Sequence, residues 1–256
     1  RAYEIVKYVG DLGLTAFFPN SLALYALTRK MLVALKRAGV NSLILAVESG
    51  SERILKHVMK KPLKLDIVSR VAKDCREIGI YTDCNILFGL PGETKQDIED
   101  SQNFLKSVKA NWFRINVATP LIGSEMHEVC EDKSYFKGVV VESNYKKAIV
   151  ETEDFTAAYI QEVTYDTNID LNFVHNADLE MGDYDVALAG FENVINVKPD
   201  HALAHYYASI CLEQLGKDEL ALEHFDKYLL FSKNVFWNKY IKKYDLPTKK
   251  YSELCL

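Results

Sequence analysis

The stretch YTDCNILFGLPGET, residues 81–94, shows within fourteen residues how the first half of this chain is built. Its first eight residues form a short β-type run, which is expected to be a buried strand. Glycine and proline at residues 89–92 predict a tight turn. Thr94, followed three residues later by Asp97, can cap a helix in the manner of a weakened capping box. The stretch therefore predicts a strand, a turn and a helix in immediate succession.

The same alternation extends to both sides of this stretch. Amphipathic segments of roughly 10–15 residues separate four short β-type runs, at Leu14–Pro19, Ser42–Glu48, Tyr81–Phe88 and Phe113–Thr119. Thr28 can cap a helix over Arg29–Ala38 that ends at Gly39, and a helix from about Leu65 stops at Gly79. Successive strand–helix units predict an α/β fold with parallel strands. Since four strands cannot close a barrel, we expect an open or incomplete sheet.

Composition is that of an ordinary globular protein. Of the 256 residues, 48% are hydrophobic and 26% charged, and the formal charge of −5 favours neither a nucleic-acid nor a membrane surface. No apolar run approaches the roughly 18 residues of a membrane helix. The five scattered cysteines lack CxxC spacing and predict a reduced, cytoplasmic protein, with Cys75 and Cys84 in the core. The chain opens at Arg1 inside a predicted helix, Ala2–Val9, so we expect it to be a piece of a longer protein.

The last third contains an internal repeat. Glycine, alanine and phenylalanine recur with a period of 34 residues, as Gly182, Ala187 and Phe191 and then as Gly216, Ala221 and Phe225. This order and period resemble the tetratricopeptide repeat (TPR). Asp218 and Lys233 depart from the pattern, where tyrosine and proline are usual. We predict two units, the first with a degenerate helix at about 168–181, and a capping helix around Phe236–Tyr244. The alternative is a pair of unrelated helical hairpins.

Candidate binding residues follow each predicted strand, because ligands of α/β barrels sit at the carboxyl ends of the strands. Each candidate also has a purely structural interpretation. A carboxylate can cap the next helix, glycine and proline can shape a turn, and a Thr-Pro pair can end a strand. The candidates are Asn20, then Glu48, Ser49 and Gly50, then Phe88, Gly89, Pro91 and Gly92, and finally Thr119 and Pro120.

In this order and spacing the segments resemble the radical S-adenosylmethionine (radical SAM) superfamily, in particular the subgroup often preceded by a cobalamin-binding domain. Ala46–Ser51 and Phe88–Thr94 are the most diagnostic segments, and the resemblance covers roughly Ala2–Glu131. It implies a partial TIM-type barrel holding the third to sixth strands. The predicted organisation is a barrel part at 1–131, a connector at 132–164, TPR-like repeats with a capping helix at 165–245, and a tail at 246–256.

The resemblance also implies roles for the candidate residues. Glu48 and Ser49, with Gly50, would contact the ribose or methionyl end of S-adenosylmethionine (SAM). The turn at Gly89–Gly92, after Phe88, would line the adenine side through backbone groups. Thr119 and Pro120 would close the adenine pocket, and Asn20 would face the same cavity.

The chain departs from the family at one decisive place. Members of the family hold a 4Fe-4S cluster on a CxxxCxxC motif and use it to cleave SAM to a 5′-deoxyadenosyl radical. Neither that motif nor the glycine-rich segment after the family's second strand occurs here. Ser21 and Ile122 are smaller departures, where relatives often have glycine and proline. We therefore predict no metal ligands in this chain, assign no catalytic residue, and leave the use of cobalamin by the full-length protein open.

Three hypotheses of function follow. The first is the C-terminal portion of a radical SAM enzyme whose repeats bind a peptide or protein partner. The second is a non-catalytic TPR scaffold with a degenerate barrel, and the third is an incomplete, inactive derivative of an enzyme. In each case we expect this chain alone to bind no cluster. His201 and His205, four residues apart, are expected to serve packing rather than zinc binding.

Overall fold

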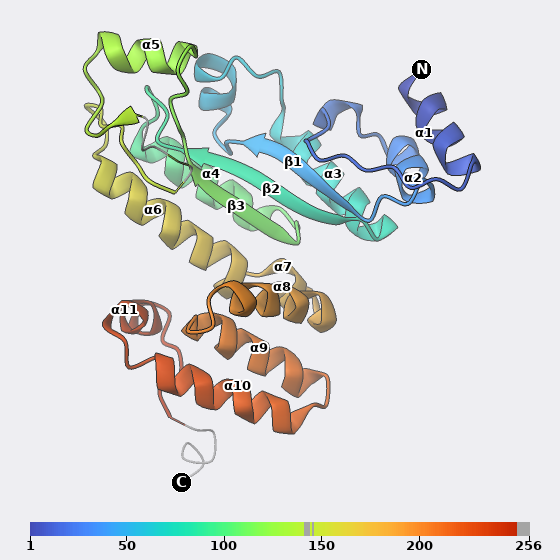
Figure 1. Ribbon diagram of the computed structural model, residues 1–256, viewed down its shortest axis with the longest axis vertical. Coiled ribbons are helices and arrows are strands. Elements are labelled where there is room, and N and C mark those ends of the chain that lie inside the picture. Colours follow the sequence, from blue (N-terminus) through green and yellow to red (C-terminus); the bar gives the residue numbers. More distant parts are fainter. Residues whose placement is uncertain (141–143, 145, 250–256) are drawn as a thin grey trace. The chain divides into compact units, whose positions relative to one another are not determined.

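A computed structural model describes residues 1–140, 144 and 146–249 of the chain (Figure 1). The chain divides into two compact units, Arg1–Leu171 and Asn172–Leu256. Part of the predicted connector at 132–164 and most of the predicted tail at 246–256, including Cys255, lie outside the described residues. No helix among the described residues is long and apolar enough to cross a membrane.

A parallel sheet of three strands forms the centre of the first unit. The strands are β1 (Ser42–Glu48), β2 (Tyr81–Phe88) and β3 (Trp112–Val117), in the order β1-β2-β3. Parallel pairing places all three carboxyl ends at one edge, and Figure 1 shows the strand arrowheads pointing toward the side where α5 (Glu125–Asp132) lies. The predicted α/β class with parallel strands is confirmed.

One face of this sheet forms the main core. Alternating residues of the strands, among them Leu45, Ile86 and Ile115, are buried together with helix residues in one hydrophobic cluster. Figure 1 shows α3 (Leu65–Ile78) and α4 (Lys95–Ser107) on this face. The strand residues that alternate with these and point to the other face, such as Asn85 and Leu87, are only half-buried. The sheet is therefore amphipathic, as expected of a layer covered by helices on one face.

The predicted strand at Leu14–Pro19 is wrong. In the structure this segment is not part of the sheet, and the Ala16 amide donates to the Ala38 carbonyl, at the end of helix α2 (Arg29–Arg37), over 2.7 Å. Phe17 is 82% exposed. An edge segment can pair on one side only, and Pro19 has no amide hydrogen for a ladder. The expectation of an open sheet holds for the described residues.

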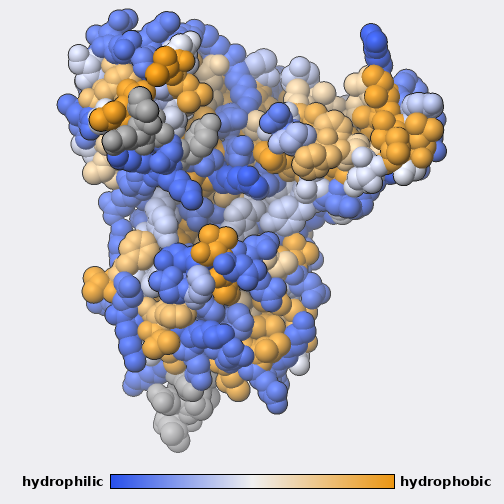
Figure 2. All heavy atoms as spheres, viewed as in Figure 1, coloured by the Kyte–Doolittle hydropathy of each residue, from blue (hydrophilic) through white to orange (hydrophobic). Residues whose placement is uncertain are grey.

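Apolar side chains are exposed beside this segment. Helix α1 (Ala2–Asp11) and the residues after it expose Ile5, Tyr8, Leu12 and Leu14, and Figure 2 shows apolar side chains gathered over this part of the unit. In the next segment, Tyr25 of the short 3-10 helix η1 (Leu24–Ala26) is exposed as well. This end of the first unit thus presents more apolar surface than scattered single side chains would.

The predicted helix boundaries at Thr28, Gly79 and Thr94 are confirmed. Thr28 caps α2 by accepting a hydrogen bond from the Met31 amide. Gly79 ends α3 in the left-handed conformation, with φ of 79°. Thr94 and Asp97 form a complete capping box at the start of α4. These boundaries were predictable because each depends on residues within one helical turn.

The first unit ends with a helix that starts in the predicted connector and runs past its end. Thr156 caps α6 (Ala157–Ile169) by accepting from the Tyr159 amide. The helix packs beside β3 and continues into a π-helical turn, Asp170–Val174. The two compact units divide within this turn.

The second unit is entirely helical in its described part. Its helices are α7 (Ala177–Met181), α8 (Tyr184–Val197), α9 (Ala202–Gln214), α10 (Asp218–Phe231) and α11 (Val235–Lys243). Gly182 and Gly216 both have positive φ and each stands two residues before a helix, α8 or α10. The alanine and phenylalanine of each repeat are buried. The period seen in the sequence therefore corresponds to equivalent positions in two helices.

The first helix predicted for the repeats, at about 168–181, is interrupted. Asn176 is the reason, because its side chain accepts from the Leu179 amide over 2.9 Å and donates to the Asn172 carbonyl over 3.0 Å. A side chain that bonds the local backbone competes with a continuous helix. A new helix, α7, therefore starts at Ala177. A helix, α11, is present at the position predicted for the capping helix, around Phe236–Tyr244.

The two threonine caps should differ in their contribution to stability. Thr94 exchanges bonds with both the backbone and the side chain of Asp97, whereas Thr156 accepts one bond from Tyr159. We expect Thr94→Ala to lower the free energy of unfolding by about 1–2 kcal/mol and Thr156→Ala by about 0.5–1 kcal/mol. Urea unfolding followed by circular dichroism measures both. Equal losses would contradict the special role of the capping box.

Candidate functional site

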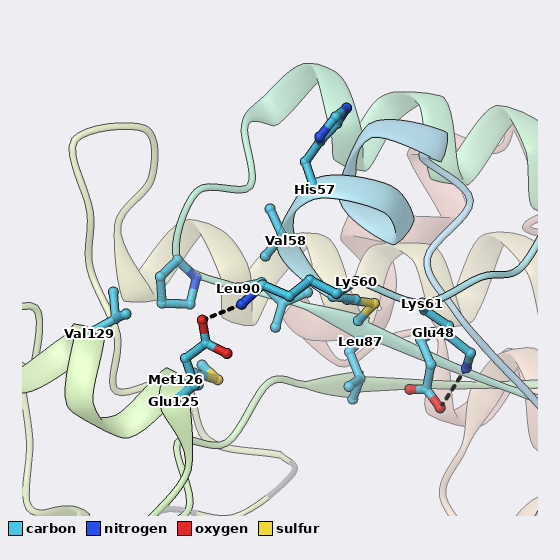
Figure 3. A pocket seen from close by; sticks show the side chains of 12 residues that line it. Glu48, His57, Val58, Lys60, Lys61, Leu87, Leu90, Glu125, Met126 and Val129 are labelled. Atoms are coloured by element: carbon cyan, nitrogen blue, oxygen red, sulfur yellow. Dashed lines mark hydrogen bonds and ion pairs between the residues drawn. The ribbon is translucent and has the colours of Figure 1, made fainter.

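A cavity of about 640 Å³ lies at the carboxyl edge of the sheet (Figure 3). Glu48 at the end of β1 forms one part of its wall, together with Leu87 near the end of β2 and Leu90 and Pro91 in the turn that follows. The π-helical turn η2 (Ile54–Val58), the residues after it and helix α5 form the rest. Its lining residues are Glu48, His57, Val58, Met59, Lys60, Lys61, Leu87, Leu90, Pro91, Glu125, Met126 and Val129.

Glu48 has an unusual backbone conformation at this edge. Its φ is 72°, and the pairing of β1 with β2 shifts register between Ala46 and Glu48. A left-handed conformation is strained for a residue with a side chain and is found mostly where the surrounding structure enforces it. The local break in the strand leaves the Glu48 side chain in the wall of the cavity instead of the regular strand face.

Lys61 is the charged partner of Glu48. Its Nζ lies 3.7 Å from Glu48 Oε1 and donates to the Ala46 carbonyl over 2.5 Å. Burial raises the pKa of Glu48, and the nearby Lys61 ammonium opposes this shift. Burial lowers the pKa of Lys61, and Glu48 opposes that shift in turn. Each charge thus stabilises the other in a place where neither would be well solvated.

A second ion pair spans another part of the cavity. Lys60 Nζ lies 2.6 Å from Glu125 Oε1, and both side chains are exposed. Figure 3 shows the two ion pairs with Leu87 between them. Leu87, Leu90 and Met126 supply apolar wall. The arrangement suits a ligand that has opposite charges close together and an apolar or flat body.

Of the residues predicted from the sequence, Glu48 and Pro91 line this cavity. Ser49 is fully buried, with its Oγ 3.2 Å from Ser101 Oγ in α4. The Gly50 amide donates to the same Ser101 Oγ over 3.0 Å. A Cβ added at Gly50 would lie only 2.7 Å from the Ser101 Cα. Ser49 and Gly50 therefore fasten the end of β1 to α4, directly behind Glu48.

The turn after β2 is held by a buried carboxylate. Glu93 Oε2 accepts from the Gly89 amide over 2.7 Å and from the Leu90 amide over 3.3 Å. Gly89 and Gly92 both have positive φ, which explains the glycines at these positions. The Gly92 carbonyl accepts from Arg53 over 2.7 Å. Phe88, just before the turn, is buried in the main core.

Asn20, Thr119 and Pro120 are not among the lining residues of this cavity. Asn20 is exposed in the irregular segment before α2. Thr119 Oγ1 donates to the Val117 carbonyl over 3.4 Å, and Pro120 is buried. They lie two and three residues after the end of β3, at the same edge of the sheet as the cavity, whereas the predicted strand extended to Thr119.

Lys60, Lys61 and Glu125 are site residues that the sequence reasoning missed. Two adjacent lysines after a helical segment are typical of a solvated surface, and no motif links them to Glu48. Glu93 was also missed, although it stands inside the diagnostic segment. A glutamate that follows Gly-Leu-Pro-Gly at a strand end could have suggested that its carboxylate closes the turn.

The described cysteines do not form a cluster site. Cys75, Cys84, Cys130 and Cys211 are all free and buried, and burial raises the pKa of the Cys75 thiol to about 12. The described residues contain no group of three or more histidine, cysteine or acidic side chains placed to hold a metal ion. His201 instead caps α9 by accepting from the Ala204 amide. The residues present in this part of the chain do not fit a 4Fe-4S cluster.

Glu93 should make stability depend on pH. Burial raises its pKa to about 8, although the two backbone amides oppose the shift. Because the folded state favours the protonated form, this contribution is complete below the ordinary pKa of 4.5 and is lost as pH rises through about 8. Glu93→Gln keeps an acceptor but cannot ionise. As the pH rises from about 5 to about 9, the free energy of unfolding of the wild type should therefore fall relative to that of Glu93→Gln. Urea titrations at each pH measure both values. Parallel pH profiles would contradict the assignment.

Gly50 should tolerate no side chain. Gly50→Ala places a methyl group against the Ser101 backbone, and we expect a loss of about 1–3 kcal/mol of unfolding free energy. Gly138→Ala is the matched control, since its Cβ would meet only the Ile149 side chain, at 3.3 Å. Comparable losses in both variants would show that the approach of Gly50 to α4 is not specially close.

Part of the first unit is similar in sequence to a known protein family. Residues 15–105 match the Radical SAM superfamily. A cytidylyl-2-hydroxyethylphosphonate methyltransferase of Streptomyces wedmorensis is 26% identical over 136 residues, 51% of this chain and 26% of its own length. A tRNA-2-methylthio-N(6)-dimethylallyladenosine synthase of Desulfotalea psychrophila is 37% identical over 68 residues, 25% of this chain and 15% of its own length.

A solved structure also resembles the chain. It is the radical S-adenosylmethionine methyltransferase TsrM from Kitasatospora setae, with cobalamin and a 4Fe-4S cluster bound. Sequence identity is 14% and the TM-score 0.38, over 79% of this chain and 43% of TsrM. The present chain spans about a quarter or less of the curated relatives named above. The segment from residue 15 to residue 105, which carries β1, β2 and Glu48, thus matches the radical SAM superfamily, with a methyltransferase and a methylthiolating enzyme among its relatives.

Proposed function

We propose that the first unit is the SAM-binding part of a radical SAM enzyme. The observation that carries this proposal is the cavity at the carboxyl edge of the sheet, with the Glu48–Lys61 pair in its wall. The same part of the chain matches the radical SAM superfamily. A barrel-type sheet normally binds its ligand at this edge.

The charges of the cavity suit the amino-acid end of SAM. That end carries an ammonium and a carboxylate close together, and Glu48 and Lys61 present the complementary charges 3.7 Å apart. Glu48 can alternatively accept hydrogen bonds from the ribose hydroxyls, which are also donors. Leu87, Leu90 and Met126 offer apolar contact for the remainder of the molecule.

The other predicted residues take supporting roles in this proposal. Ser49 and Gly50 hold Glu48 in place through Ser101. The turn that begins at Gly89, with Pro91 in the cavity wall, is proposed to lie along the adenine. Thr119 and Pro120 are proposed to border the same side, supported by their position directly after β3, and Asn20 to face the ligand from the segment before α2.

The proposed reaction needs a group that the described residues do not hold. In the superfamily a 4Fe-4S cluster supplies the electron that cleaves SAM, and the described residues hold no ligands for it. Because its relatives include a methyltransferase and a methylthiolating enzyme, we propose transfer of a methyl-type group from SAM. We propose cobalamin as a cofactor only if the transferred group is a methyl group; TsrM contains cobalamin. The described residues contribute the binding and orientation of SAM.

The helical unit is proposed to be a TPR-like module that binds a peptide or protein partner. Support comes from the 34-residue period and from the equivalent positions of Gly182 and Gly216 before α8 and α10. The proposed cytoplasmic location is supported by the free, buried cysteines. The competing function, a scaffold with a degenerate barrel, requires partner binding but no SAM binding.

SAM binding by the purified chain tests the proposal. Calorimetric titration should detect SAM binding, and Glu48→Gln and Lys61→Met should each weaken it by about tenfold or more, because each removes a charge-assisted contact. Lys64→Met, an exposed lysine outside the cavity, is the control and should leave binding unchanged.

Fragments of SAM separate the two roles of Glu48. If Glu48 binds the ammonium, Glu48→Gln weakens binding of methionine. If it binds the ribose, the same variant weakens binding of 5′-deoxyadenosine. No measurable SAM binding, or binding that both variants leave intact, would contradict the proposal and favour the scaffold.

A further inference from the structure

A second cavity adjoins the first at the carboxyl end of β1. Its volume is about 440 Å³, and it lies between the segment before α2 and the residues after Lys61. Its lining residues are Ser21, Leu22, Ala23, Leu24, Tyr25, Ala46, Lys61, Pro62 and Leu63. Lys61 lines both cavities, and β1 contributes Ala46 to this one and Glu48 to the other. The two cavities therefore share Lys61 as a lining residue and are both bordered by the end of β1.

The charges that face the two cavities differ. Glu48 and Lys61 both line the first, which is suited to a ligand with both charges. Among the residues that line the second, Lys61 is the only one with a basic or acidic side chain. The others are apolar or carry a hydroxyl group. A ligand in the second cavity thus contacts the Lys61 ammonium and no carboxylate among the lining side chains.

Lys61 has donor capacity left for such a ligand. Its ammonium has three N–H donors. One donates to the Ala46 carbonyl over 2.5 Å, and Glu48 Oε1, at 3.7 Å, is beyond hydrogen-bond distance. The side chain is 29% exposed, so its charge is only partly hydrated. An additional anion would therefore form a strong, charge-assisted hydrogen bond at this point.

Part of the wall of the second cavity is apolar and buried. Leu24 and Leu63 are 3% and 9% exposed, so their positions are set by the packing of the unit. Leu22 and Ala46 are half-buried. Such walls favour an aliphatic or aromatic group over a sugar or a polar chain.

We propose that the second cavity binds a small amphipathic anion, whose apolar group lies among the leucines and whose carboxylate, phosphate or phosphonate contacts Lys61. This proposal rests on the proposed function in one respect: the anion is taken to be a co-substrate that binds beside SAM. The shared lysine then positions both ligands at one edge of the sheet.

Three aromatic probes of similar size test the chemistry. Phenylacetate and phenylphosphonate carry the anion, and 2-phenylethanol is the uncharged analogue. Titrations of the chain with methyl-labelled leucine, followed by NMR, should show both anions shifting Leu22, Leu24 and Leu63, with binding about tenfold or more tighter than that of the alcohol. Lys61→Met should reduce anion binding to the level of the alcohol. Comparison of the affinities of the two anions shows whether the cavity prefers a carboxylate or a phosphonate.

A matched pair of variants locates the site. Ala23 lines the cavity, whereas Ala26, three residues later on the same exposed segment, does not. Ala23→Leu should abolish the leucine shifts caused by the anions, and Ala26→Leu should preserve them. Both variants should still bind SAM, because neither residue lines the first cavity.

The outcomes separate this proposal from the proposed function. Anion binding without SAM binding would support the second cavity and contradict SAM binding by the first. SAM binding with no anion binding up to about 10 mM would overturn the second cavity alone. Equal affinity for the alcohol and the anions, or anion binding unaffected by Ala23→Leu, would overturn it as well.

Discussion

The parallel pairing of β1 with β2 is the constraint on which the site depends. Parallel strands end at the same edge, so Glu48 and the turn that begins at Gly89 are brought together although 41 residues separate them. Pairing alone would leave Glu48 in a regular strand. The register shift and the positive φ of Glu48 place its side chain in the wall of the cavity. The hydrogen bonds of Ser49 and Gly50 to Ser101 hold that conformation. Helix α4, which is capped by Thr94, therefore supports the site from behind the sheet.

Burial explains why Glu48 and Lys61 are paired. A carboxylate at Glu48 without Lys61 would lose hydration and gain nothing in return, and the same holds for the ammonium. In this half-buried place each charge opposes the pKa shift that burial imposes on the other, and a ligand can exchange contacts with either. For Glu93, retention of the proton, instead of pairing with a cation, reduces the cost of burying a carboxyl group. Its buried Oε1 has no hydrogen-bond partner among the described residues, and burial outweighs the opposing effect of Arg53 and raises the pKa of Glu93 to about 8.

Local features of the fold could be predicted from the sequence, and features that depend on distant residues could not. The caps at Thr28 and Thr94 and the end of α3 at Gly79 need only neighbouring residues, and all three were predicted. Leu14–Pro19 has the composition of a strand, but a strand also needs a partner, and the Ala16 amide bonds to Ala38 instead. Glu48 was found because a strand end is visible in the sequence. Lys61 was missed because only the packing of η2 against the sheet brings it to Glu48.

The position of Lys61 also constrains how ligands in the two cavities would influence one another. One ammonium faces both spaces, and its contacts to Glu48 and Ala46 tie it to β1. An anion in the second cavity would draw part of this charge away from Glu48. A ligand ammonium beside Glu48 would weaken the hold of Glu48 on Lys61 and leave the lysine freer to bind the anion. By thermodynamic reciprocity, each ligand would then change the affinity of the other by the same factor. A single side chain can in this way couple two binding sites without any movement of the sheet.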